Sequence, residues 1–267
     1  MLKLMMSRDI KIIFYRQMKI PRQKTSFYHK IFYKNIDLLL VITDKLKEEA
    51  CRNLPINKDK VKKLTYGISK PSSIIGVDTP NFLKYNNFNS ELFSIGIFSR
   101  VEEQKGQHLV LEAMNISSNQ MSAYIIGHVM SNQYKERLLE TAKKYKLTKH
   151  LKFVEFLESP MSCMPFFDLI ILPTYEETFG LVAAEAMIMG VPVIGSDAGG
   201  VPEVISHGDT GLLFKTKDAK DLSEKIDIIF ENKPLRDKFI FNASKFALKE
   251  YNYSKHFDSL DKIINSI

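Results

Sequence analysis

The chain has 267 residues, which is long enough to bury a sizeable core in one or two domains. Apolar residues make up 45% of it and charged residues 26%, as is ordinary for a soluble globular protein, and no apolar run approaches the ~18 residues of a membrane span. The first residues break their apolar run with charges too soon for a signal peptide. Cys51 and Cys163 lie far apart, outside any metal or redox spacing, and predict reduced thiols in a cytosolic compartment.

The net charge of +7 is concentrated in residues 1–35, which hold nine lysines and arginines and one acid. Aromatic side chains are interleaved with these cations: Phe14, Tyr15, Phe27, Tyr28, Phe32 and Tyr33. One interpretation is a solvated basic face over a few core aromatics. A second is a patch for anionic lipid headgroups or a phosphate-bearing acceptor. A third is a nucleic-acid surface, although no recognised binding motif accompanies the charge.

Along the rest of the chain, short β-rich apolar runs that end in turn residues alternate with helical patterns. Strands are predicted at 36–44, 61–69, 92–100, 122–127, 150–157, 167–174, 192–197 and 210–214. Helices are predicted at 45–53, from about Gln107, from about Asn132, over 177–190, near Pro202, and through 218–267. Because the strands are apolar throughout, the pattern indicates an α/β fold with a doubly wound parallel sheet covered on both faces.

In such sheets, ligands bind at the carboxyl ends of the strands, so informative residues should follow strands. Arg100 and Lys105 follow the strand at 92–100, and Gly106 precedes a helix. Two cations beside a helix amino terminus make an anion site that suits a diphosphate. Arginine can grip a phosphate bidentately, and lysine supplies a compact charge. Two solvated surface charges are the alternative interpretation.

The stretch ETFGLVAAEAMIMG at 177–190 predicts a helix that is apolar nearly all the way round, yet Glu185 sits in its middle and Glu177 stands just before it. Eight helical residues separate these acids by roughly 12 Å along the axis. The carboxyls of a hydrolase pair lie only ~5–9.5 Å apart. The spacing therefore suits contacts with two parts of one elongated ligand. The alternative is one capping Glu and one Glu buried against a cation.

Two further segments offer backbone N–H groups. Thr178, Phe179 and Gly180 open the helix that carries Glu185, where the first amides lack helical partners. In VPVIGSDAGGVPEVI, a strand ends in a loop with Gly199 and Gly200, whose small size would let amides approach a phosphate. Taken alone, a Gly-Gly loop is usually a turn.

In this order, FSRVEEQKGQ, LPTYEETFGLVAAEAMIMGVPVIGSDAGGVPEVI and GDTGLLF resemble the carboxy-terminal domain of glycosyltransferase family 4. These are retaining, nucleotide-sugar-dependent enzymes of the GT-B fold. The resemblance covers residues 92 to about 215 well and 36 to 70 more loosely. It implies a GT-B-type, Rossmann-like doubly wound parallel sheet, with a partial second Rossmann-like domain at the amino terminus.

By that resemblance, Arg100, Lys105 and Glu177 are the catalytic residues: the two cations hold the donor diphosphate, and Glu177 binds hydroxyls of the transferred sugar. The predicted donor-binding residues are Gly106, Thr178, Phe179, Gly180, Leu181, Glu185, Gly127, Phe156, Gly199 and Gly200. Among them, Glu185 would bind the ribose, and the base would lie near Gly127 and Phe156. A DxD motif is absent, and we expect no metal and no cofactor, since fixed cations can stabilise the leaving group.

The chain departs from the family at its amino-terminal end. Family members carry a complete first domain that begins with a glycine-rich strand-loop, and this chain keeps only about its last third. The predicted division is a partial acceptor-side domain at 1–70, a linker at 71–91, a donor-binding domain at 92–240, and helices returning to the first domain at 241–267.

The resemblance implies transfer of a sugar, with retention, from a nucleotide sugar to a glycan or lipid-linked acceptor in surface polysaccharide or lipopolysaccharide biosynthesis. The expected location is cytoplasmic, peripheral on the inner membrane face, with residues 1–35 on an anionic surface. A separate polypeptide is an expected partner that would supply the missing amino-terminal half of a working enzyme. The alternative is a nucleotide-sugar-binding remnant or subunit that has no turnover alone. A basic nucleic-acid-binding module is the third hypothesis, and we expect no nucleic-acid partner.

Overall fold

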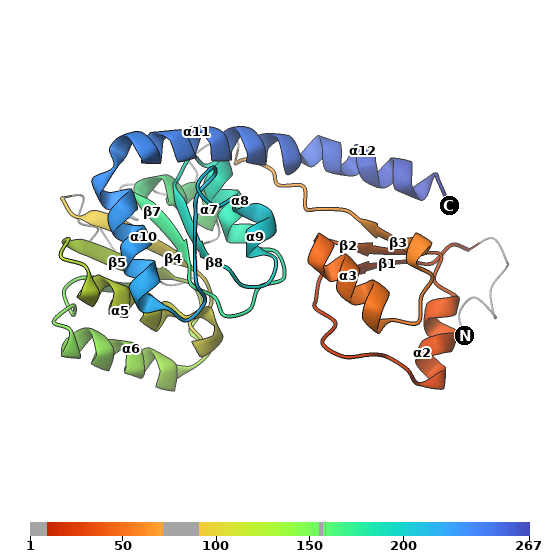
Figure 1. Ribbon diagram of the computed structural model, residues 1–267, viewed down its shortest axis with the longest axis horizontal. Helices are drawn as coiled ribbons and strands as arrows, with labels where there is room; N and C mark the ends of the chain where they lie inside the picture. The colour runs from red at the N-terminus through yellow and green to blue at the C-terminus, as the bar shows by residue number, and fades with distance from the viewer. Residues whose placement is uncertain (1–9, 72–90, 155–156, 158) are drawn as a thin grey trace. The chain divides into compact units, whose positions relative to one another are not determined.

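The computed structural model describes residues 10–71, 91–154, 157 and 159–267 (Figure 1). The chain divides into two compact units, one formed by residues 1–69 and 251–267 and the other by residues 70–250. None of the helices within the described ranges combines the length and the apolar character that crossing a membrane requires.

The first unit is built on a three-stranded parallel sheet in the order β1-β2-β3. Its strands are β1 (Ile13–Arg16), β2 (Leu38–Val41) and β3 (Val61–Lys63). Its helices are α2 (Phe27–Lys34), α3 (Asp44–Asn53), the short 3-10 helix η1 (Lys58–Lys60) and α12 (Tyr253–Ile264).

Apolar side chains of this sheet pack against the carboxy-terminal helix. Leu38 and Leu40 of β2 are buried, and Leu260 and Ile263 of α12 pack on the same cluster. Residues 251–267 belong to the same unit as the amino-terminal residues, and the amide of Ile68 donates a hydrogen bond of 2.8 Å to the carbonyl of Tyr251.

The second unit carries a six-stranded, all-parallel sheet in the order β6-β5-β4-β7-β8-β9. The strands are β4 (Phe93–Phe98), β5 (Met121–Ile126), β6 (Leu151–Val154), β7 (Leu169–Leu172), β8 (Val193–Ser196) and β9 (Leu212–Phe214). The helices are η2 (Glu103–Lys105), α5 (Gln107–Ile116), α6 (Asn132–Lys144), α7 (Pro160–Cys163), η3 (Met164–Phe166), α8 (Leu181–Ile188), α9 (Val201–Val204), α10 (Ala219–Glu231) and α11 (Lys233–Glu250).

Helices cover both faces of this sheet, as Figure 1 shows. Side chains alternate along each strand, so Ile171 joins the cluster that α5, α6 and α10 cover, while Ile170 points to the other face. Every residue of β5, β7 and β8 is buried. This confirms the prediction of an α/β, doubly wound parallel sheet, because strands covered on both faces must be apolar throughout.

Some boundaries differ from the predictions. The strand predicted at 61–69 ends at Lys63, and the helix predicted over 177–190 begins at Leu181. The division between the units falls after Glu250 rather than at 240, because α11 packs against α8 and buries Phe239, Ala243 and Ala247. Most of the predicted linker at 71–91 lies outside the described residues.

Candidate functional site

The site lies where the strand order of the larger sheet reverses. After β4 the chain builds β5 and β6 on one side, and it then returns to place β7, β8 and β9 on the other. The loops that follow β4 and β7 therefore diverge from neighbouring strands and leave a crevice between them. In open α/β sheets this topological switch point is the usual place of ligand binding.

A cavity of about 240 Å³ occurs at this position. Its lining includes Arg100 and Lys105 from the segment after β4, Glu177 from the segment after β7, and Gly180 and Leu181 from the start of α8. The structure therefore brings together five of the predicted site residues, although up to 81 residues of chain separate them.

Charged side chains in this cavity are paired with one another or with neighbours. Lys105 Nζ lies 3.0 Å from Glu177 Oε2, and the two side chains are only 20% and 27% exposed. Arg100 Nη2 lies 2.9 Å from Glu102 Oε1, and its side chain is 58% exposed. Arg100 is therefore the more solvent-exposed cation, while Lys105 is less exposed and is paired with the carboxylate of Glu177.

The turn at Gly106 explains how Lys105 reaches the cavity. Gly106 has φ +67°, and a Cβ there would lie 2.1 Å from the carbonyl oxygen of Pro173 in the loop after β7. Only glycine combines this left-handed conformation with so close an approach of two backbones. The predicted Lys105-Gly106 pair is thus a tight turn packed directly on the loop that leads to Glu177.

The start of α8 offers backbone amides to the cavity. No side chain caps this helix, whose N-cap residue is Gly180. The amide of Thr178 instead donates to its neighbour's Glu177 Oε1 at 3.1 Å. Phe179 is 4% exposed and belongs to the core, so its side chain is unavailable to a ligand. What α8 presents is its amino-terminal N–H groups and the positive end of its dipole.

Glu185 lies one turn further along α8. It follows Leu181 by four residues, so it shares that residue's face of the helix about 6 Å away along the axis. It does not line the 240 Å³ cavity. Burial raises the pKa of Glu185 to about 7. Across the described part of the chain its carboxylate has no hydrogen-bond or ion-pair partner.

The remaining predicted residues have other surroundings. Gly127 follows β5, and its amide donates to the carbonyl of Val154 at 3.1 Å. Gly200 does not offer a free amide, because its N–H donates to the carbonyl of Glu177 at 2.9 Å. A Cβ at Gly199 would lie 1.7 Å from that same carbonyl oxygen. The Gly-Gly loop therefore supports the backbone of Glu177, and Phe156 lies outside the described residues.

Sequence reasoning missed two side chains that shape the site. The buried amide of Gln107 donates from Nε2 to the carbonyl of Arg100 (2.8 Å) and to Ser99 Oγ (3.0 Å). Tyr175, two residues before Glu177, shares a hydrogen bond of 2.7 Å with His108. Both residues stand within the quoted motifs, but the sequence pattern assigned them no role, and only their contacts in the folded chain reveal one.

The larger unit is a parallel sheet wound in both directions. At its switch point lie a cationic turn, an acid and an uncapped helix start, as in a Rossmann-like domain of the GT-B kind. Within the described ranges, no group of three His, Cys, Asp or Glu side chains could hold a metal ion. The family model of glycosyl transferases group 1 matches residues 78–246. The chain therefore belongs to the glycosyl transferases of group 1.

Individual relatives agree with this assignment. The capsular polysaccharide biosynthesis glycosyltransferase CapM of Staphylococcus aureus is 22% identical over 236 residues, which are 85% of this chain and 61% of CapM. The N,N'-diacetylbacillosaminyl-diphospho-undecaprenol alpha-1,3-N-acetylgalactosaminyltransferase of Campylobacter jejuni is 28% identical over 215 residues, which are 78% of this chain and 55% of that enzyme. The chain thus spans little more than half the length of these relatives.

Solved structures show the same fold. The crystal structure of Anabaena HepE in complex with UDP and glucose superimposes with a TM-score of 0.83 and 20% identity, covering 96% of this chain and 72% of HepE. A glycosyltransferase from Rickettsia africae gives the same TM-score of 0.83 at 20% identity, over 94% of this chain and 69% of that structure. The predicted GT-B-type fold is confirmed by these matches.

Proposed function

We propose that this chain is a glycosyltransferase that moves a sugar from a nucleotide-sugar donor to a glycan or lipid-linked acceptor in surface polysaccharide biosynthesis. One observation carries the proposal: Arg100, Lys105, Glu177 and the start of α8 surround one cavity at the switch point. Two cations, a carboxylate and uncapped amides match the diphosphate and the hydroxyl groups of such a donor. The names of the Staphylococcus and Campylobacter relatives support the acceptor class.

The diphosphate of the donor binds to the two cations. Arg100, exposed and planar, grips phosphate oxygens bidentately, and Lys105 contributes a point charge in a drier position. The amino terminus of α8 adds its dipole and its unpaired N–H groups. Binding the diphosphate draws Lys105 away from Glu177, because both anions compete for the same ammonium group.

The two glutamates bind the neutral parts of the donor. Glu177, released from Lys105, accepts hydrogen bonds from hydroxyls of the transferred sugar. Glu185, one turn beyond the cavity, accepts hydrogen bonds from the ribose. Burial has removed water from this carboxylate and raised its pKa to about 7, and the ribose hydroxyls replace the lost hydrogen bonds to water.

The chemistry follows from these charges. The bond between the anomeric carbon and the diphosphate oxygen breaks, and its electron pair moves onto the oxygen. Negative charge grows on the diphosphate while the sugar becomes oxocarbenium-like. The acceptor oxygen bonds to the same face of that carbon, so configuration is retained, and its proton passes to the leaving phosphate. Arg100, Lys105 and the α8 dipole stabilise this leaving group, and each such contact is typically worth about 3 kcal/mol in the transition state.

A thermal-shift screen of nucleotide sugars tests donor binding, since a ligand that binds only the folded state raises its stability. UDP-sugars come first, because HepE was crystallised with UDP and glucose. We expect a stabilising donor whose effect persists in EDTA and is lost in Lys105→Met. The control Lys143→Met removes an exposed lysine from α6 and should leave the shift unchanged. A chain stabilised by no nucleotide sugar, or equally stabilised in both variants, would refute the proposal.

Donor binding without turnover is the second candidate function. It is favoured because the cavity is built wholly from residues 97–182, whereas the chain spans only 61% of CapM and 55% of the Campylobacter enzyme. The two candidates separate when nucleotide release is measured on the stabilising donor. Release by this chain with a lipid-linked acceptor establishes the transferase. Release only after a polypeptide carrying the acceptor-side half is added establishes a subunit.

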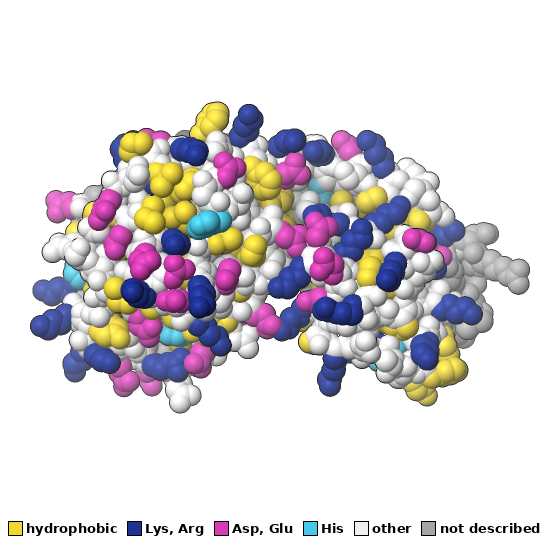
Figure 2. All heavy atoms as spheres, in the orientation of Figure 1, with side chains coloured by type: hydrophobic (Ala, Val, Ile, Leu, Met, Phe, Trp, Pro, Cys, Tyr) yellow, Lys and Arg dark blue, Asp and Glu magenta, His cyan; other side chains and the backbone are white. Residues whose placement is uncertain are grey.

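The aromatic and basic helix α2 supports a location at an anionic membrane face, on the cytoplasmic side where nucleotide sugars are available. Phe27 is 71% exposed, Tyr28 82% and Phe32 51%, and the same helix carries Lys30 and Lys34. Figure 2 shows hydrophobic side chains beside Lys and Arg in the region where Figure 1 places α2. Exposed aromatics among cations are the composition of an interfacial helix. Vesicles with and without anionic lipid test this location.

A further inference from the structure

Three side chains form a continuous hydrogen-bonded chain beside the candidate site. Tyr175 Oη lies 2.7 Å from His108 Nε2, and His108 Nδ1 lies 2.9 Å from Tyr134 Oη. Tyr175 stands in the loop after β7, His108 in α5 and Tyr134 in α6. The two hydroxyls therefore connect the loop that carries Glu177 to two helices of the scaffold.

Tyr175 also contacts the residues on either side of Lys105, Gln104 and Gly106. Its backbone N–H donates to the carbonyl of Gln104 at 2.9 Å. Its ring approaches Gly106 closely, since a Cβ added there would lie 3.3 Å from Tyr175 Cε1. The Nζ of Lys217 lies 4.9 Å from the centre of the same ring, where a cation is attracted to the π face. Tyr175 thus contacts the neighbours of Lys105 while standing two residues before Glu177.

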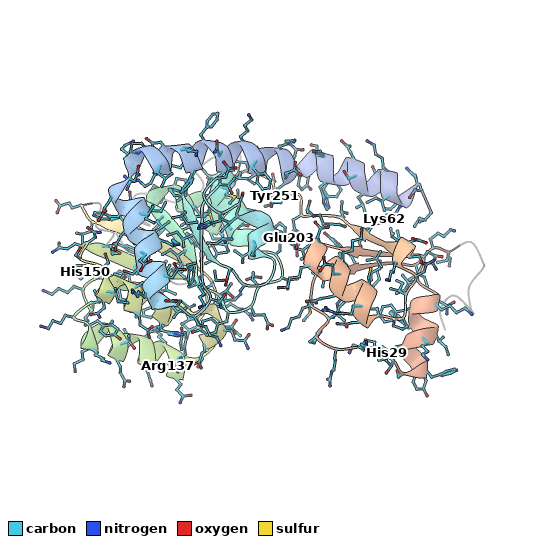
Figure 3. The ribbon with its side chains drawn as sticks, in the orientation of Figure 1. His29, Lys62, Arg137, His150, Glu203 and Tyr251 are labelled. Atoms are coloured by element: carbon cyan, nitrogen blue, oxygen red, sulfur yellow. The ribbon has the colours of Figure 1, made fainter. Side chains whose placement is uncertain are left out.

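Tyr134, at the far end of this series of hydrogen bonds, is anchored as well. Arg137 of α6, labelled in Figure 3, lies with its Cζ 4.9 Å from the centre of the Tyr134 ring. The same guanidinium pairs with Glu103 at 2.8 Å, and Glu103 begins the 3-10 turn that ends at Lys105. Both partners of this ion pair are exposed, so the pair itself contributes little. The part-buried hydrogen bonds of His108 are the stronger part of the connection.

A neutral imidazole suits this position. It donates from one ring nitrogen and accepts at the other, so it fixes the directions of both tyrosine hydroxyls. Burial of His108 lowers its pKa, the carboxylates of Glu112 and Glu103 act in the opposite direction, and Arg137 adds to the lowering. The ring is therefore uncharged at neutral pH, and the hydrogen bonds keep one geometry.

We propose that Tyr175 and His108 are positioning residues, which hold the Lys105 turn and the Glu177 loop at the spacing that a single nucleotide-sugar donor requires. Lys105 and Glu177 are 72 residues apart in the sequence. Tyr175 is bonded to the segments of both through its amide, ring and hydroxyl. The ligand part of this inference rests on the proposed function, whereas the ordering of the loop does not.

The ligand-free test is amide hydrogen exchange of residues 174–180, measured by mass spectrometry. Tyr175→Phe removes the hydroxyl and keeps the ring on Gly106, so the protein should fold with an almost unchanged Tm. We expect exchange in this loop to rise about tenfold in Tyr175→Phe and in His108→Leu, as local opening becomes easier. His108→Gln keeps one donor and one acceptor and should restore most of the protection. Tyr145→Phe, which removes a hydroxyl at the end of α6, should change nothing.

The ligand test compares two probes, UDP and UDP-glucose. UDP carries the diphosphate and the ribose but no sugar for Glu177, whereas UDP-glucose must reach Lys105 and Glu177 together. We expect Tyr175→Phe to weaken UDP-glucose binding about tenfold and UDP binding less than threefold, with His108→Gln intermediate. A merely structural role would weaken both probes equally, and that result would overturn the proposal.

The two tests separate the possible failures. Unchanged exchange at 174–180 in both Tyr175→Phe and His108→Leu overturns the positioning role, whatever the ligands do. If the wild-type chain binds neither probe while loop exchange rises as expected, the proposed function fails for uridine donors. The ordering role of Tyr175 and His108 is then established without it.

Discussion

Lys105 Nζ lies 3.0 Å from Glu177 Oε2, across 72 residues of chain, inside the cavity at the switch point. The pair keeps a cation and an anion together in a place where each alone would be costly to desolvate. In this pair the carboxylate of Glu177 competes with the donor diphosphate for Lys105, and the ammonium of Lys105 competes with the sugar hydroxyls for Glu177. A diphosphate must replace the carboxylate at Lys105, and sugar hydroxyls must replace the ammonium at Glu177.

Removing the carboxylate should therefore separate the two halves of the donor. In Glu177→Gln, Lys105 loses its competitor, so a nucleoside diphosphate alone should bind about three- to tenfold more tightly. The corresponding nucleotide sugar should bind more weakly and turn over at least 100-fold more slowly, as for the loss of one transition-state contact. Titration calorimetry with both ligands measures the difference.

Glu176→Gln is the control for that substitution, because it removes an exposed acid from the same loop. It should leave both affinities within twofold of the wild type. Equal weakening of diphosphate and nucleotide sugar by Glu177→Gln would contradict the proposed division of roles.

The raised pKa of Glu185 predicts a pH-dependent stability. Burial lifts this pKa from 4.5 to about 7, so the native state holds the proton more tightly than the unfolded state. Stability is then lost as pH rises from about 4.5 to about 7, and the loss amounts to about 3 kcal/mol above that range. Glu185→Gln should raise the free energy of unfolding by up to about 3 kcal/mol at pH 8 and by less than about 1 kcal/mol at pH 5.

Urea denaturation at several pH values measures this gain. Glu136→Gln, at an exposed position of α6, should show no such trend. A gain for Glu185→Gln that is as large at pH 5 as at pH 8 would show that the carboxylate is not held in a desolvated place.

A methyl group should cost more stability at Gly199, in the Gly-Gly loop, than at Gly208, in the segment before β9. Gly199 and Gly208 both have positive φ, +59° and +78°, so alanine costs about 1–2 kcal/mol at each. A Cβ at Gly199 meets the carbonyl oxygen of Glu177 at 1.7 Å, whereas at Gly208 it meets nothing within 4 Å. Gly199→Ala should therefore destabilise the protein by about 1–3 kcal/mol more than Gly208→Ala.

The same pair reports on the site. Because Gly199→Ala displaces the backbone of Glu177, it should also weaken nucleotide-sugar binding, while Gly208→Ala should not. Thermal unfolding and donor titration of the two variants give both readouts. Equal losses of stability in Gly199→Ala and Gly208→Ala would mean that the backbone near Glu177 can move to accommodate the added methyl group.

The basic segment should bind anionic lipid. Each cation near an anionic surface contributes about 1 kcal/mol. Neutralising Lys19, Arg22 and Lys24 to Gln should therefore lower binding to phosphatidylglycerol vesicles roughly 100-fold in co-sedimentation. Phosphatidylcholine vesicles should bind neither protein strongly.

A charge-matched control removes three exposed lysines from the other unit: Lys143, Lys144 and Lys149. It should reduce vesicle binding far less. Vesicle binding that is unchanged in the first variant, or reduced equally in both, would end the membrane assignment.

Much of the fold could be predicted from the sequence because parallel strands buried on both faces leave a plain signal. The runs that became β4, β5 and β7 are apolar at nearly every position. β1 and α2 escaped prediction because IFYR is short and FYHKIFYK mixes cations with exposed aromatics. The helix predicted from 177 starts at Leu181, because distant bonds hold the preceding loop, such as that between Tyr175 and Gln104.

The site could be predicted in part for a similar reason. Arg100, Lys105 and Glu177 follow strands, and the carboxyl ends of adjacent parallel strands meet at one edge of the sheet. Spacing alone could not tell that Lys105 pairs with Glu177 or that Gly200 binds its carbonyl. Nor could it reveal His108, whose bond to Tyr175 joins positions 67 residues apart. Those facts depend on side-chain directions that only the folded chain fixes.

The most direct measurement is a crystal structure of this chain with the nucleotide sugar that stabilises it most. We expect the diphosphate on Arg100 and Lys105, the sugar hydroxyls on Glu177, and the ribose on Glu185. Lys105 Nζ should have left Glu177 Oε2 for a phosphate oxygen. A donor bound elsewhere, or bound here with the Lys105–Glu177 pair intact, would contradict the proposed donor site.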